Sequence, residues 1–137
     1  MTKKQISKLK KICVEYGAKL VLKKLDSYGQ YDDDKKIVYL HKDLIWNEKI
    51  VYSILFHELG HKYCCDNNIY VAYHHSTGGK QAYILTALRA EKFVDNWAAK
   101  ELKKRGFKFR YPYFYSVSSR IKKLKEHTKQ EADRYFN

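Results

Sequence analysis

The sequence has few residues that interrupt helices and strands or form disulfide cross-links. Its 137 residues include one proline, six glycines and three cysteines. Two of the cysteines, Cys64 and Cys65, are adjacent, and an odd number with this spacing argues against a disulfide framework. We therefore expect a folded chain in a reducing compartment, the cytoplasm.

Long apolar runs are also missing. About 18 successive apolar residues would be needed to span a membrane, and the lysine-rich start is followed by no apolar stretch of the kind found in signal peptides. With 45% hydrophobic residues and the length of one domain, the chain is expected to form a single domain over residues 1–137. We expect no membrane partner.

Negative charge is scarce, and the formal net charge is +13. Residues 100–137 hold twelve basic and four acidic residues, a net charge of +8, so a basic helical segment is expected from about residue 107. Such a segment is either a solvated lysine face or a contact for nucleic acid. Within it, Lys108-Phe109-Arg110-Tyr111 alternates charge with rings, as nucleic-acid contacts and buried strand edges both do.

Apolar periodicity and capping residues predict an α+β fold. Thr2 and Asn47 are expected to cap the first two helices, and Gly106 to follow the third. The helices are expected over residues 3–16, 48–65, 81–105 and 118–135. Two strands, at 18–25 and 37–40, flank a predicted turn at 27–30. These elements predict a small antiparallel sheet with packing helices, and a loop over 69–80.

The segment His57-Glu58-Leu59-Gly60-His61 lies late in the second predicted helix, which we expect to be amphipathic. Residues four apart share a helix face, so His57 and His61 can present imidazoles to one metal ion. Glu58 lies on the adjoining face and could act as general base on a water molecule. The spacing predicts two ligands and a base of a zinc hydrolase.

A catalytic zinc site needs a third protein ligand. A third histidine six residues after His61 is excluded, because Asn67 stands there. Glu91 in the third predicted helix is the better candidate, and Asp95, one turn later, could accept the second ring N–H of a ligand histidine. His74 and His75 remain rivals, either as a ligand or as a donor to the oxyanion.

Two further sets of residues are left open by the sequence. Cys64 and Cys65 follow His61 closely enough for a thiolate to reach the metal, although free cysteines are more often buried apolar residues. The oxyanion stabiliser is unknown, and several tyrosines are equally eligible for that role: Tyr70, Tyr73, Tyr111, Tyr113 and Tyr115.

The order of these elements and motifs resembles the ImmA/IrrE family of metallopeptidases over about residues 18–102. The resemblance rests on the His57–His61 motif and on Glu91-x-x-Val94-Asp95-x-Trp97-Ala98-Ala99. It implies a minimal zincin-like domain of the gluzincin type, with Glu91 as the third ligand of one Zn²⁺. The chain departs from the family at Val94, usually alanine, and at Trp97, usually phenylalanine.

The resemblance also implies a function. Members of that family typically cleave a DNA-binding repressor of a mobile element or stress response, so a repressor is the expected protein substrate and partner. Two alternatives remain: a zinc-containing regulator without proteolytic activity, and a nucleic-acid-binding module that uses the basic C-terminal region.

Overall fold

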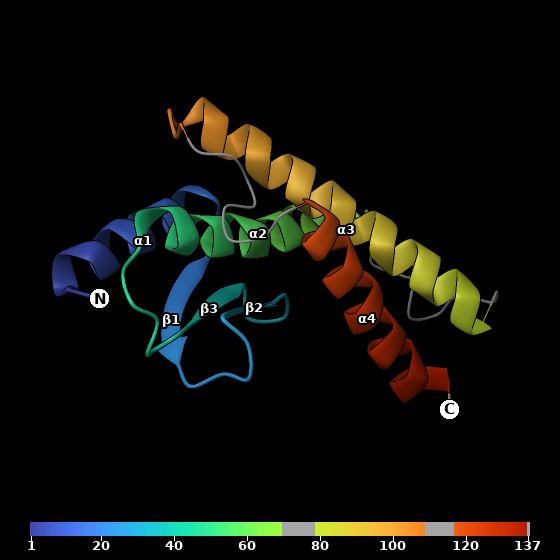
Figure 1. Ribbon diagram of the computed structural model, residues 1–137. Helices are drawn as coiled ribbons and strands as arrows, with labels where there is room; N and C mark the ends of the chain where they lie inside the picture. The colour runs from blue at the N-terminus through green and yellow to red at the C-terminus, as the bar shows by residue number, and fades with distance from the viewer. Residues whose placement is uncertain (70–78, 109–116, 137) are drawn as a thin grey trace.

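The computed structural model describes residues 1–69, 79–108 and 117–136, which form four helices and three strands. Figure 1 shows the small sheet on one side of the central helix and the long third helix crossing on another. The α+β class is thus confirmed. In chain order the elements are α1 (Lys3–Glu15), β1 (Lys19–Lys23), β2 (Gly29–Asp32), β3 (Ile37–His41), α2 (Glu48–Asp66), α3 (Gly79–Lys104) and α4 (Val117–Phe136).

The first two helices begin where their capping residues stand. Thr2 Oγ1 accepts a hydrogen bond from the Gln5 backbone N–H at 3.2 Å, and Gln5 Oε1 accepts one from the Thr2 N–H at 2.8 Å. Asn47 Oδ1 accepts from the Ile50 N–H at 3.3 Å. These side chains satisfy N–H groups that have no partner within the helix, which is why the predicted starts are confirmed.

The sheet differs from the predicted antiparallel pair. Its strand order is β1-β3-β2, with β1 parallel and β2 antiparallel to β3. The purely antiparallel prediction is wrong because a third strand, β2, begins at Gly29 inside the expected turn and forms the hairpin with β3. The sequence of β2, Gly-Gln-Tyr-Asp, has little of the apolar alternation that marks a strand.

The main core lies between the sheet, α1, α2 and the C-terminal half of α3. Leu20 of β1 pairs with Val38 of β3, and both are buried in this core together with Leu40. Lys19 and Lys23 are exposed on the opposite face of β1. Helix α2 is buried on most of its circumference rather than along one stripe, so the amphipathic prediction is wrong for this helix. Its neighbours cover it on several sides.

A second, smaller core joins the N-terminal half of α3 to α4. Tyr83 and Ala87 of α3 pack against Ala132 of α4, with Ile84 at the margin. Thr128 of α4 is also buried. Within the described ranges, no helix is long and apolar enough to cross a bilayer.

Candidate metal centre

Three side chains from two helices converge on one point. His57 and His61 extend from α2, and Glu91 extends from α3. The Nε2 atoms of the two histidines are 3.2 Å apart. Glu91 Oε2 lies 3.2 Å from His57 Nε2, and Glu91 Oε1 lies 3.4 Å from His61 Nε2. The predicted ligand residues are therefore neighbours in space, although 30 residues separate His61 from Glu91 in the chain.

The convergence depends on a close approach of α2 and α3 at Gly60. A Cβ atom at position 60 would lie 2.8 Å from Val94 Cγ1 and 3.3 Å from the Val94 carbonyl oxygen. Real Cβ atoms essentially never come within 3.0 Å of another heavy atom. Glycine at this position allows Val94 to pack directly on the backbone of α2, which brings Glu91 within reach of both histidines.

Aromatic packing stabilises the same crossing on the side of α3 that faces α2. Trp97 packs at ring-centroid distances of 5.7 Å from Tyr16, 6.5 Å from Phe56 and 5.5 Å from Tyr63. Aromatic pairs at these separations stabilise a contact beyond their buried area. Trp97 of α3 thus contacts α2 and the residue that follows α1.

Asp95 lies where the sequence predicts a supporting carboxylate. Its Oδ1 is 3.1 Å from His57 Nδ1. If Nδ1 carries the proton and donates it to Asp95, Nε2 keeps its lone pair toward His61 and Glu91. Asp95 therefore orients the ring of His57 for ligation.

The local charges shift the pKa values of His57 and Glu91 in opposite directions. Burial by itself lowers the pKa of His57, but hydrogen bonds to Asp95 and Glu91 and nearby negative charge outweigh it and raise the pKa to about 10. Burial likewise raises the pKa of Glu91, but hydrogen bonds from His57 and His61 hold it well below its usual range. Without a metal ion, a proton therefore sits among these groups at neutral pH.

The donor set fits a zinc ion. Zinc binds imidazole nitrogen at about 2.0–2.1 Å and carboxylate oxygen at about 2.0–2.2 Å, in tetrahedral geometry. Two ligand atoms of such a site lie about 3.3–3.5 Å apart. The two histidine Nε2 atoms are 3.2 Å apart, and each lies 3.2 or 3.4 Å from a different oxygen of the Glu91 carboxylate. Among the described residues, His57, His61 and Glu91 form the group that could hold a metal ion.

Glu58 is buried beside the metal centre, against the sheet. A Cβ atom added at Gly29 of β2 would lie 3.2 Å from Glu58 Cγ and 2.8 Å from Ile54 Cγ2. Gly29 therefore lets β2 approach the α2 face that carries Glu58. Sequence reasoning assigned Gly29 to a turn and missed this contact; the only local signal was a glycine between two polar residues.

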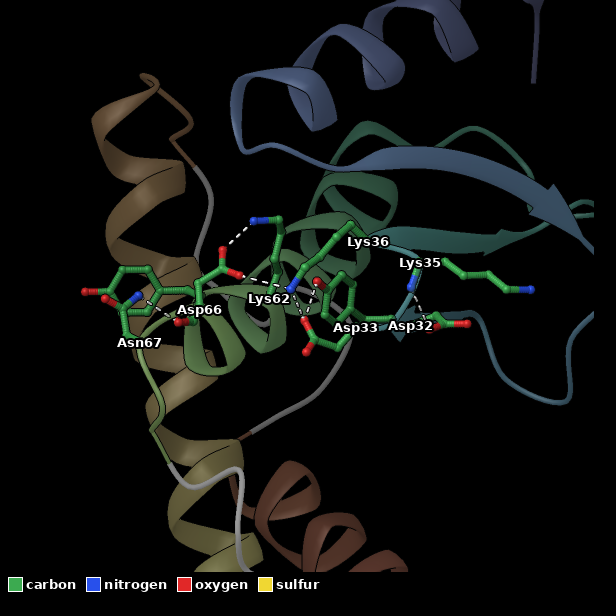
Figure 2. Close-up of polar contacts among 9 residues, drawn as sticks. Asp32, Asp33, Lys35, Lys36, Lys62, Asp66 and Asn67 are labelled. Carbon is green, nitrogen blue, oxygen red and sulfur yellow. Dashed lines mark hydrogen bonds and ion pairs between the residues drawn. The ribbon is translucent and has the colours of Figure 1, made fainter.

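A polar network that the sequence analysis did not predict ties the β2–β3 hairpin to the end of α2. Figure 2 shows Lys36 of the hairpin and Lys62 of α2 both reaching Asp66. Lys36 Nζ is 3.4 Å from Asp66 and 2.6 Å from Asp33. Lys62 follows His61 directly, and the i, i+4 spacing of Lys62 and Asp66 was the available sequence signal. The network fixes the hairpin beside the metal centre.

The other candidates are resolved in part. Cys64 is buried, and burial raises the pKa of its thiol to about 11, so it behaves as the apolar residue that the sequence favoured. His74, His75, Phe109, Arg110 and the five tyrosines considered as oxyanion donors lie outside the described residues. Most of the loop predicted over 69–80 lies there too.

Comparison with protein-family models, with curated proteins and with solved structures gives no match to this chain.

Proposed function

We propose that the chain is a zinc-dependent endopeptidase. One observation carries the proposal: His57, His61 and Glu91 each offer a ligand atom, these atoms lie within 4.8 Å of one another, and Glu58 follows the first candidate ligand in the same helix. Three protein ligands leave a fourth position for water or substrate, as catalytic rather than structural zinc sites do. His61 is 31% exposed in its side chain, so the centre is open to solvent.

Each side chain has a distinct role in this proposal. A zinc ion bound there would lower the pKa of a coordinated water toward about 7 and polarise a peptide carbonyl. Glu58 accepts the proton of the attacking water and delivers it to the leaving amine. Asp95 holds His57 in the ligating tautomer.

The free edge of β2 supports a peptide as substrate. In the described part of the chain, β2 pairs with β3 alone, so no second strand covers its other edge, and the Gly29 carbonyl accepts a hydrogen bond from Ser27 Oγ at 2.8 Å. An extended peptide can add to such an edge through main-chain hydrogen bonds. Because Gly29 of β2 lies against Glu58, a peptide bound there would pass near the general base.

We further propose a DNA-binding repressor as the natural substrate. This rests on the resemblance of the two motifs around His57 and Glu91 to the ImmA/IrrE pattern. The repressor encoded beside the gene for this chain is the first substrate to test.

The test is cleavage of that repressor by zinc-loaded protein and by Glu58→Gln. We expect the variant to bind one zinc ion per chain with unchanged affinity and to lose activity by about 10²–10⁴-fold, the usual contribution of a general base. Glu126→Gln is the matched control, because Glu126 is exposed on α4. Full activity of Glu58→Gln would overturn the proposed mechanism. Zinc binding without cleavage by the wild-type protein would favour a regulator instead.

A further inference from the structure

Five of the eight exposed positions of helix α1 are lysine. All five of its lysines are exposed, and no carboxylate precedes Glu15 in the chain. Leu9, Ile12 and Cys13 face the core from the opposite side. The five lysines are Lys3, Lys4, Lys8, Lys10 and Lys11. At 1.5 Å per residue they cover about 12 Å of helix.

This charge distribution opposes the stability of the helix. The first turn of α1 has no acidic residue and its last turn no basic residue, the reverse of what the helix dipole favours. Lys4 and Lys8 are a like-charge pair at i, i+4, which also destabilises a helix. Local helix stability therefore gives no reason for five lysines here.

The lysines of α1 also lack acidic partners. In the described residues, none of the five has an ion-pair partner, whereas Lys36, Lys62 and Lys80 each pair with at least one aspartate. Lys8 Nζ lies 6.0 Å from the centre of the Tyr52 ring, and the one carboxylate on α1, Glu15, pairs with Arg105. The positive charge of this face is free to meet an outside anion.

We propose that the lysine face of α1 binds the phosphate backbone of double-stranded DNA without sequence preference. Lysines that neutralise phosphates release counterions, which supplies most of non-specific DNA affinity. The exposed positions of α1, all of which are described, carry no aromatic side chain on which single-stranded bases could stack.

Other anionic partners fit this face less well. An interfacial helix on a membrane buries its apolar side in lipid, but the apolar side of α1 packs in the protein core. A protein interface normally needs large buried anchors, and Val14 is the one exposed large apolar residue of α1. Apart from Val14, this face offers mainly lysine ammonium groups, which are among the groups that contact phosphate oxygens in protein–DNA complexes.

This site is separate from the candidate metal centre and from the basic C-terminal helix. In Figure 1, α1 and α4 lie at opposite ends of the molecule. DNA binding by α1 therefore requires neither zinc nor Glu58. It would place a metal centre beside proteins that are bound to DNA.

The experiment measures binding of the full chain to a labelled random 20-base-pair DNA by fluorescence anisotropy over a series of salt concentrations. Five phosphate contacts predict a slope of log K against log salt of about −4.5. The variant Lys3→Gln, Lys10→Gln, Lys11→Gln should reduce that slope by about 2.7 and weaken binding at 0.1 M salt at least about 10-fold. Glutamine keeps the helix propensity, so α1 should remain folded.

A matched variant removes the same charge from α4: Lys122→Gln, Lys125→Gln, Lys129→Gln. These lysines are exposed, and the proposal predicts an unchanged slope. Arginine at positions 3, 10 and 11 should restore binding. Equal loss in both glutamine variants would show an effect of net charge alone and overturn the proposal. Loss only in the α4 variant, no salt-dependent binding by wild type, or tighter binding to single strands, RNA duplexes or anionic vesicles would also overturn it.

Discussion

Helix α3 packs on a different helix at each of its ends. Its C-terminal half packs on α2, where Val94, Ala98 and Leu102 are buried. Its N-terminal half packs on α4, where the described buried residues include Tyr83 and Ala87 of α3 and Ala132 of α4. The buried positions of α3 follow one another at helical spacing along one face. The same face of one helix therefore packs on α2 at one end and on α4 at the other.

The charged groups of the two contacts differ as well. At the α2–α3 contact, His57, Glu91 and Asp95 are each less than a quarter exposed. At the α3–α4 contact, Lys80 and Asp133 form an ion pair whose side chains are 32% and 42% exposed. Buried charges demand partners, whereas exposed pairs contribute little to stability. The difference supports the proposal that the metal centre lies at the α2–α3 contact.

The largest contrast is expected between two glutamates, one at each contact. Glu91→Gln removes a charged ligand and should weaken zinc binding by about 100-fold or more. This loss should exceed the loss expected when a residue that only hydrogen-bonds to a ligand is changed. Glu131→Gln alters the carboxylate that contacts Tyr83 and His127, and it should leave zinc affinity within about 3-fold. Competition with a chromogenic chelator measures both. Equal losses of zinc affinity in the two variants would mean that the metal site does not lie at the α2–α3 contact.

A second contrast concerns packing at the helix crossing. Gly60→Ala should lower the free energy of unfolding by about 1–3 kcal/mol, because the new methyl group meets Val94. Val94→Ala removes the Cγ1 methyl group that the new side chain at position 60 would contact. In the double variant the two losses should therefore be less than additive by about 1 kcal/mol or more, measured by urea unfolding. Strict additivity would mean that the two residues are not in contact.

The pH dependence of zinc binding follows from His57. Because its pKa is raised to about 10 in the metal-free protein, zinc must displace a proton at pH 8. Calorimetry in buffers of different ionisation enthalpy should report this released proton, and zinc affinity should rise with pH. Asp95→Asn removes one cause of the raised pKa and should reduce the release. A zinc affinity independent of pH between 6 and 9 would contradict the assignment.

The same shift predicts how metal-free stability depends on pH. A raised folded-state pKa stabilises the protein fully below the unfolded value, 6.5, and this contribution is lost as pH rises toward about 10. The lowered pKa of Glu91 acts in the other direction, because its contribution is present above pH 4.5 and lost in acid. Unfolding of the metal-free protein between pH 2 and 10, compared with Asp95→Asn, checks both signs.

The smallest effect is expected at the exposed pair of the α3–α4 contact. Lys80→Gln should change the free energy of unfolding by no more than about 0.5 kcal/mol, since an exposed ion pair is weak. Zinc affinity should stay the same. Thermal unfolding together with zinc titration tests this; a loss of zinc binding would show that α4 supports the metal centre after all.

The sequence predicted the parts of the fold that depend on local signals. Thr2 and Asn47 identified helix starts because capping is a contact within four residues. The motif predicted His57, Glu58 and His61 as members of the candidate metal centre, because helical spacing fixes which side chains share a face. Asp95 followed from its position one turn after Glu91.

The contacts that depend on distant partners were missed. Nothing near Gly29 indicates that β2 will lie against Glu58, and nothing near Gly60 indicates that Val94 will pack on it. The parallel pairing of β1 with β3 depends on β3 being inserted between β1 and β2, which no local pattern in residues 18–25 encodes. The burial of α2 on most sides likewise comes from its neighbours.

The most direct test of the metal assignment is anomalous diffraction at the zinc edge from crystals of the zinc-loaded protein. The account predicts one peak per chain, about 2.0–2.2 Å from His57 Nε2, His61 Nε2 and a Glu91 carboxylate oxygen. A peak with other ligands, or zinc-saturated protein with no peak between α2 and α3, would contradict it.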